Sequence, residues 1–315
     1  MNQVTIKRRG VSGDGVYKGL LASAAALLFI VVGLIVYEVV RGAELSVRTI
    51  GWQFLIQTEW DPVADKYGAL PYIYGTLVSS LLALIMAVPL GIGSAVFLAE
   101  IASRRVGSIV SFVMEILAAI PSIVYGIWGF FVLAPFLRAV VEPWLIANFG
   151  FLPLFSGSLF GIGMLNAGII LAIMIVPTIV SISREVLLAT PPTLREASLA
   201  LGATRAEAIG VTLDAARPGI LGAIILALGR ALGETMAVTM VIGNSNRISL
   251  SLLDPGATMS SIIANEFTEA TGALYLSALI QIALVLFAVT IVVNALARLL
   301  LYFATGGRRD AAGAA

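Results

Sequence analysis

The stretch from residue 273 to residue 303 reads ALYLSALIQIALVLFAVTIVVNALARLLLYF and carries a single charged side chain, Arg298. A helix of about 20 apolar residues is long enough to cross the hydrocarbon core of a bilayer, which is about 30 Å thick. The strands of membrane barrels are shorter, about 10 residues, and alternate apolar with polar positions. This run is longer and apolar on every side, so it predicts a transmembrane α-helix.

Five further apolar stretches of the same kind precede it. They lie at about residues 19–40, 71–99, 107–135, 161–183 and 218–242. Charged residues inside them are few. They are Glu38 near the end of the first, Glu115 early in the third, and Arg230 with Glu234 in the fifth. We therefore expect an all-α membrane protein with six transmembrane helices.

The composition agrees with a membrane protein and excludes several other classes. Hydrophobic residues make up 59% of the 315 positions and charged residues 12%, whereas a soluble domain carries about 25% charged residues. Much of the exterior must therefore face membrane lipid. A net charge of +1 argues against a nucleic-acid partner, which requires a basic excess. Cysteine and histidine are absent, so we expect no metal site, no cofactor and no catalytic residue.

The basic residues that flank the spans predict the orientation. With the N-terminus in the cytoplasm, the cytoplasmic side collects Lys7, Arg8, Arg9, Lys18, Arg104, Arg105, Arg184, Arg195, Arg205, Arg217, Arg298, Arg308 and Arg309. The opposite side receives Arg41, Arg48, Lys66, Arg138 and Arg247. Cytoplasmic loops are enriched in lysine and arginine, so we expect a multi-pass inner-membrane protein with both termini cytoplasmic. The first span is longer than the apolar core of a signal peptide and should remain as an anchor.

The longest interior connection, residues 184–217, is rich in charged residues. Pro191 and Pro192 should end the preceding helix. Thr193 followed by Glu196 has the pattern of a capping box, and Gly202 separates two expected helical stretches at about 193–201 and 203–213. The segment is either an amphipathic linker or a docking element that carries force from a partner. The chain has no G-x-x-x-x-G-K-[ST] phosphate cradle, so energy for transport would have to come from another protein.

Arg230 and Glu234 form the second notable pattern. An arginine near the middle of a span costs about 2.5–3.5 kcal/mol on insertion scales. In a continuous helix, residues four apart share one face and can pair. The pair is either a salt bridge that fastens helices or a fixed charge in a translocation path, because guanidinium matches the geometry of an oxyanion. Gly229 and Gly233 would let another helix or a ligand approach closely.

The interior segment 195–204, REASLALGAT, resembles the cytoplasmic coupling motif of ABC-importer permeases, whose core is Glu-Ala-Ala, three residues and Gly. Ser198 stands in place of the second alanine, and Leu213-Asp214 stands in place of the usual closing Leu-Pro. The resemblance implies that this helix docks on an ATP-binding subunit. The residues that match the motif at this contact are Arg195, Glu196, Ala197 and Gly202.

The segment 229–239, GRALGETMAVT, is similar to the phosphate-specific permeases of the PstC type. The similarity continues at residues 119–126 (AIPSIVYG), 176–178 (VPT), 242–244 (IGN), 255–256 (PG) and 264–267 (ANEF). It implies the type I ABC-importer permease fold, a role for Arg230 and Glu234 in phosphate passage, and no enzymatic activity in this chain. The implied partners are a homologous second permease, two ATP-binding cassette subunits and a periplasmic phosphate-binding protein.

The expected organisation is a cytoplasmic tail, a first span with a periplasmic loop, a permease core with coupling helices, and a second cytoplasmic tail. Their expected bounds are 1–18, 19–70, 71–303 with the coupling helices at 193–213, and 304–315. Two alternatives stay open. One is a permease for another oxyanion, sulfate or molybdate. The other is a stand-alone secondary transporter or channel, which predicts inverted repeats or broken helices at matching positions and leaves 184–217 without a role.

Overall fold

A computed structural model describes residues 13–304 of the chain. Within this range, six helices are long and apolar enough to cross a membrane, which confirms the predicted number and the all-α class. The spans are Gly15–Ile50, Leu70–Ile101, Ser122–Phe149, Met164–Ala189, Arg205–Leu232 and Ala273–Leu300. The first helix, α1 (Gly13–Ile50), runs beyond the predicted 19–40, and its ten last residues occupy part of the expected outer loop.

The second and third spans each consist of several helical elements, and the fourth, fifth and sixth of one helix each. The second span is α3 (Leu70–Val96) followed by the π-helical turn η1 (Phe97–Ile101). The third is α5 (Ser122–Trp128), η2 (Gly129–Leu133), α6 (Ala134–Phe136), η3 (Leu137–Val141) and α7 (Glu142–Phe149). The fourth, fifth and sixth are α8 (Met164–Ala189), α10 (Arg205–Leu232) and α13 (Ala273–Ala304). Outside the spans lie α2 (Gln53–Ile56), α4 (Arg104–Ala119), η4 (Pro153–Phe155), α9 (Pro192–Ala200), α11 (Met236–Val241) and α12 (Met259–Glu266).

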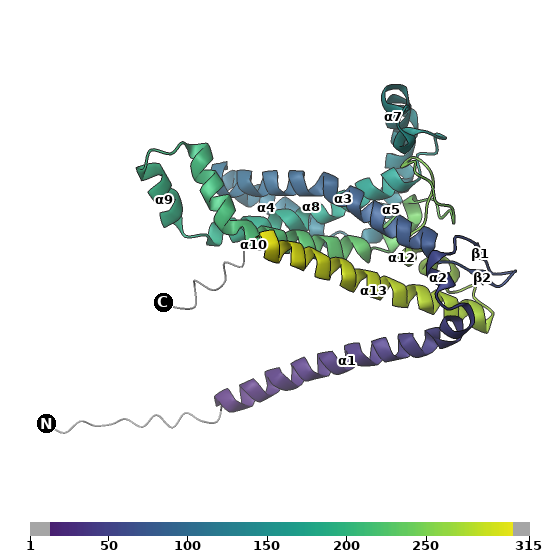
Figure 1. The fold of residues 1–315 in the computed structure, drawn as a ribbon. Helices are drawn as coiled ribbons and strands as arrows, with labels where there is room; N and C mark the ends of the chain where they lie inside the picture. Colours follow the sequence, from purple (N-terminus) through teal and green to yellow (C-terminus); the bar gives the residue numbers. More distant parts are fainter. Residues whose placement is uncertain (1–12, 305–315) are drawn as a thin grey trace, which may run out of the picture.

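The helix α8 lies at the centre of the bundle. Two-thirds of its most apolar window, 67%, is buried, against 28% for α10 and none for α1. It packs against α3, α10 and α4, and the main apolar cluster joins α8 to α3, η2 and α11. Figure 1 shows α1 on the outside of this bundle beside α13, and α9 projecting from one end. We refer to the two ends of the bundle as the α9 end and the hairpin end.

The third predicted span, 107–135, is wrong. The structure contains a helix break at Ile120 and Pro121, where the backbone is extended, so α4 ends at Ala119 and the membrane-length helix begins at Ser122. The cause is local: proline has no N–H for a helical hydrogen bond and restricts the residue before it. The helix that begins at Ser122 continues as far as Phe149, beyond the predicted end of the span at residue 135.

The fifth predicted span, 218–242, is also displaced. The second interior helix, expected at 203–213, is the first part of α10, which continues without interruption to Leu232. The capping box lies at Thr204 and Glu207: the Thr204 amide donates to Glu207 Oε2 at 2.7 Å. The predicted box at Thr193 is wrong, because α9 begins at Pro192, with Pro191 as its N-cap and no side-chain cap.

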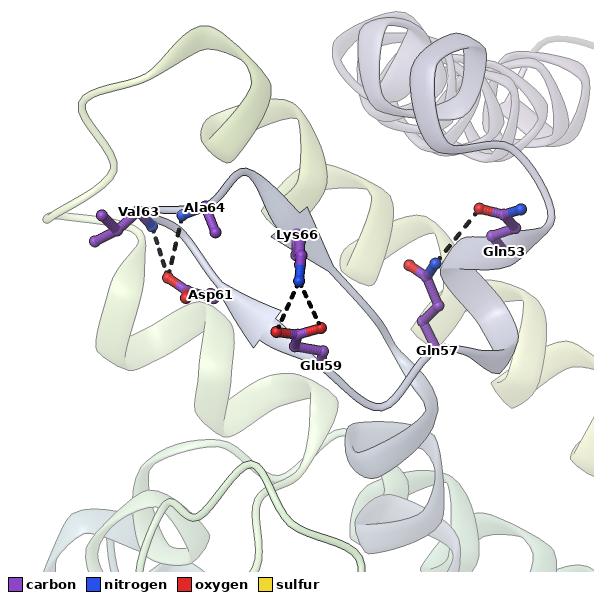
Figure 2. Close-up of polar contacts among 7 residues, drawn as sticks. All are labelled: Gln53, Gln57, Glu59, Asp61, Val63, Ala64 and Lys66. Carbon is purple, nitrogen blue, oxygen red and sulfur yellow. Dashed lines mark hydrogen bonds and ion pairs between the residues drawn. The ribbon is translucent and has the colours of Figure 1, made fainter.

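A small hairpin covers the opposite end of the bundle. Strands β1 (Trp60–Asp61) and β2 (Lys66–Tyr67) pair antiparallel. Figure 2 shows Asp61 accepting hydrogen bonds from the Val63 and Ala64 amides in the turn, and Lys66 paired with Glu59 across the hairpin. Gln57, just before the hairpin, donates to Gln53 of α2. These local bonds fix the turn of a ribbon too short to be stable alone.

The hairpin is held on the bundle by an aromatic cluster. The Trp60 ring meets Tyr67 and Tyr72 edge to face, with ring centroids 5.1 and 5.3 Å apart. Glu266 of α12 accepts hydrogen bonds from Trp60 Nε1 at 2.7 Å and from the Tyr275 hydroxyl at 2.6 Å. The cluster therefore ties together the hairpin-end termini of α3, α12 and α13.

Candidate anion pathway and docking surface

Arg230 lies in the last turn of α10 and is half-buried. Within residues 13–304, its guanidinium makes no hydrogen bond and no ion pair. Gly229 has no other group within 4 Å of where a Cβ would stand, and Gly233 has only the Gly229 carbonyl at 3.7 Å. The close helix approach expected at these glycines is not made by the described chain. Arg230 is thus an uncompensated charge next to open space.

Glu234 does not share a helix face with Arg230. The helix ends at Leu232, Gly233 is its C-cap, and the chain resumes as α11 at Met236. Glu234 lies in the break: its Oε1 accepts from the Ala237 amide at 3.3 Å, and its carbonyl accepts from Ser260 Oγ at 2.7 Å. The salt bridge, one of the two interpretations of these residues, is therefore not formed within residues 13–304. The sequence indicated a continuous span because the stretches 218–229 and 236–242, on either side of this segment, are almost entirely apolar.

Tyr125 is a third polar residue near this break and was not among the predicted site residues. It lies on α5, which packs against α11 directly after the break. Its hydroxyl donates to the Leu117 carbonyl of α4 at 2.7 Å, across the Pro121 break. A Cβ at Gly126, the next residue, would lie 3.0 Å from Ala237 Cα, so α11 packs closely on α5. A tyrosine four residues after a proline inside an apolar run was the available signal.

The residues of the coupling-motif segment divide into two groups. Glu196, Ala197 and Gly202 are exposed on or just after α9, together with Leu201, which is 90% exposed. Gly202 has a φ of +88°, in the left-handed region that favours glycine. Arg195 instead turns toward the bundle, where its Nη1 lies 2.7 Å from Glu100 Oε2. The exposed group lies on and just after α9, which projects beyond the bundle (Figure 1).

Comparison with known proteins agrees with this architecture. The family model of the "binding-protein-dependent transport system inner membrane component" matches residues 87–301. The "phosphate transport system permease protein PstC" of Mesorhizobium japonicum is 46% identical over 299 residues, covering 93% of this chain and 91% of that protein. Its counterpart in Haemophilus influenzae is 44% identical over 293 residues, covering 91% and 93%.

Two solved transporters share the fold. A chain of a bacterial alginate ABC transporter aligns with a TM-score of 0.62 at 18% identity, covering 93% of this chain and 98% of that one. A chain of the MetNI methionine ABC transporter aligns with a TM-score of 0.50 at 21% identity, covering 73% and 93%. The predicted ABC-importer permease fold is confirmed, and the chain is a multi-pass permease component, not an enzyme. It belongs to the family of binding-protein-dependent transport system inner membrane components, among the phosphate transport system permease proteins of the PstC type.

Proposed function

We propose that this chain carries inorganic phosphate through the membrane as the permease subunit of an ATP-driven importer, with Arg230 as the residue that binds the anion. The observation that carries this role is the unpaired guanidinium beside open space, at a helix break within an apolar bundle. A charge at this depth is expensive unless water, a ligand or a neighbouring subunit meets it. Its planar donors match the oxygens of a tetrahedral oxyanion.

Glu234 favours phosphate over sulfate or molybdate as the anion. It lies in the same helix break, and one of its carboxylate oxygens is engaged by the Ala237 amide. A carboxylate only accepts hydrogen bonds. Phosphate keeps a proton near neutral pH and can donate that hydrogen bond, whereas sulfate has no proton to donate and would be repelled. The negative charge of Glu234 would also limit how long the anion stays on Arg230.

The assembly we propose contains a homologous second permease, two ATP-binding cassette subunits and a periplasmic phosphate-binding protein. The exposed surface around α9 supports the contact with an ATP-binding subunit, through Glu196, Ala197 and Gly202. With α9 docked on an ATP-binding subunit, we expect the α9 end and both termini in the cytoplasm, and the hairpin end in the periplasm. The tails at 1–18 and 304–315 belong to the same side, and they lie largely outside the described residues.

Uptake of labelled phosphate by cells that carry variants of the assembled transporter tests the role of Arg230. Arg230→Gln should abolish uptake while the subunits still co-purify, because the anion loses its charged partner. Arg230→Lys keeps the charge without the planar fork and should retain partial uptake. Arg247→Gln removes an exposed arginine from an outer loop and serves as the matched control, with uptake unchanged. Near-normal uptake in Arg230→Gln would refute the proposed role.

A further inference from the structure

A second group of polar side chains surrounds a cavity at the α9 end. The cavity has a volume of about 590 Å³ and lies between α4, η1 and α8. Its polar lining consists of Ser103, Ser108, Ser111 and Glu115 from the α4 segment and Arg184 from α8. None of these residues belongs to the Arg230 site or to the exposed surface around α9.

The α4 residues follow one face of the helix. Ser108, Ser111 and Glu115 are three and four residues apart, which places them in one stripe. The opposite stripe is apolar and exposed: Val106, Ile109, Val113 and Ile116. In a membrane protein, a polar helix face is directed toward the bundle interior or a water-filled space. The stripe on α4 meets this rule by lining the cavity with Arg184.

Two of the lining residues have hydrogen-bonding atoms without a partner. Ser111 Oγ and Arg184 Nε are both buried, and neither forms a hydrogen bond within the described part of the chain. Arg184 also lies more than 4.0 Å from every carboxylate of residues 13–304, Glu115 included. Buried polar atoms in native proteins almost always have a partner. Both atoms are closed to solvent in this structure, so they can meet the acceptor oxygens of a ligand when the Ser111 and Arg184 side chains, which line the cavity, turn toward it.

The combination of donors and a carboxylate defines the chemistry of that ligand. Arg184 and Ser111 donate to anionic oxygens, and Glu115 accepts from a hydroxyl. An oxyanion that keeps one proton satisfies all three groups. The same combination, an unpaired arginine with a glutamate nearby, occurs at Arg230 and Glu234. The hydrogen bond from the Tyr125 hydroxyl to the Leu117 carbonyl, two residues after Glu115, holds α5 against the end of α4.

We propose that Arg184, Ser111 and Glu115 form a second binding site for inorganic phosphate, on the cytoplasmic side of Arg230, which the anion occupies before it leaves the transporter. The order of the two sites rests on the proposed function and its orientation. Binding at Arg184 can be measured from the cytoplasmic side without transport, so the two proposals can fail separately.

The absence of cysteine from the chain makes a chemical probe of this cavity possible. Ser111→Cys places one thiol in the cavity of the assembled transporter, in inside-out vesicles. An anionic methanethiosulfonate reagent is added, and modification of this chain is followed by mass spectrometry. Inorganic phosphate should slow the reaction about tenfold once its concentration is about ten times the dissociation constant. Sulfate at the same concentration should protect much less, and equal protection by sulfate would contradict the role of Glu115.

Three further variants make the result specific. In the background of Arg184→Gln, protection by phosphate should disappear. With Arg184 present, an anionic reagent should modify Ser111→Cys faster than a cationic reagent does, and this difference in rate should be lost in Arg184→Gln. Arg105→Gln removes an exposed arginine of α4 outside the cavity and should leave protection unchanged. Glu185→Cys, next to Arg184 but outside the cavity, should show no protection.

The proposal is overturned if phosphate protects Ser111→Cys equally well with and without Arg184. It is also overturned if neither Ser111→Cys nor the more exposed Ser108→Cys reacts, because the cavity would then be closed to ions. Protection that persists in Arg230→Gln supports a site independent of Arg230. Uptake by Arg230→Gln, measured separately, decides the proposed function.

Discussion

Arg195 of α9 forms an ion pair with Glu100 of η1: Nη1 and Oε2 lie 2.7 Å apart, although the atoms are not aligned for a hydrogen bond. The Glu100 side chain is 7% exposed and that of Arg195 40% exposed. The pair attaches the projecting α9 to the end of the second span. It ties Arg195 to the bundle, whereas Glu196, Ala197 and Gly202 of the same motif segment are exposed.

Glu100→Gln should therefore weaken the attachment of α9 without removing its docking surface. The pair is intermediate between exposed and buried pairs, so the loss should be about 1–3 kcal/mol. We expect ATP-binding subunits to co-purify normally, with fewer phosphate ions transported per ATP hydrolysed. Glu44→Gln breaks an exposed ion pair with Arg48 on α1 and should change neither quantity. Loss of subunit association in Glu100→Gln would place Arg195 in the docking surface instead.

Gly202 should be sensitive to substitution because of its backbone conformation. Its φ is +88°, and a Cβ would meet no other atom within 4 Å, so the cost comes from the left-handed backbone, about 1–2 kcal/mol. Gly202→Val should leave the protein in the membrane but reduce transport-linked ATP hydrolysis. Gly210→Ala, in the interior of α10 with equally open surroundings, should be neutral or stabilising. Normal transport in Gly202→Val would show that the segment is only a linker.

The separation of Arg230 from Glu234 predicts how their variants combine. Residues that do not interact have additive effects on stability, so Arg230→Gln with Glu234→Gln should show no mutual rescue in thermal stability. Transport should stay absent in the double variant, since the binding charge is missing. Glu234→Gln alone should hold phosphate longer and lower the maximal rate of uptake. Uptake restored in the double variant would mean that the two residues act as a structural pair.

The attachment of α1 provides a test of stability rather than transport. Ser46 of α1 donates to Gln281 Oε1, and the Ser46 amide donates to Ser277 Oγ at 3.0 Å, both on α13. Gln281→Leu should destabilise this contact by about 0.6–1.7 kcal/mol, the range for hydrogen bonds between membrane helices. Asn294→Leu is the control, because Asn294 bonds only to Thr290 of its own helix. A larger loss for Asn294→Leu in thermal unfolding would contradict this assignment.

The sequence predicted the number and type of the spans because apolar length is a sufficient signal for a membrane helix. It did not predict where two of them break. Pro121 was visible, yet prolines at 89, 177 and 218 lie inside continuous helices, and only tertiary packing distinguishes these cases. The break at Gly233 has no proline at all. The expected pairing of Arg230 with Glu234 depended on a continuous helix, and the structure has instead a break at Gly233 between them.

The cavity at Arg184 also could not be predicted from the sequence. Ser108, Ser111 and Glu115 have helical spacing in the sequence, but the apolar residues between them fitted a lipid-facing span equally well. Their role depends on α4 ending at Ala119 and on α8 placing Arg184 opposite the stripe. Contacts between segments that are distant in sequence cannot be obtained from periodicity alone.

The uninterrupted course of α10 has a mechanical consequence. It begins at the capping box beside α9 and ends two residues after Arg230. At about 1.5 Å per residue, roughly 38 Å separates its first turn from that arginine. A lever of this length converts a tilt of about 5° into a displacement of about 3 Å, which is the difference between a hydrogen bond made and a hydrogen bond lost. A small rotation where ATP-binding subunits dock would therefore suffice to release an anion at the far end of the same rod.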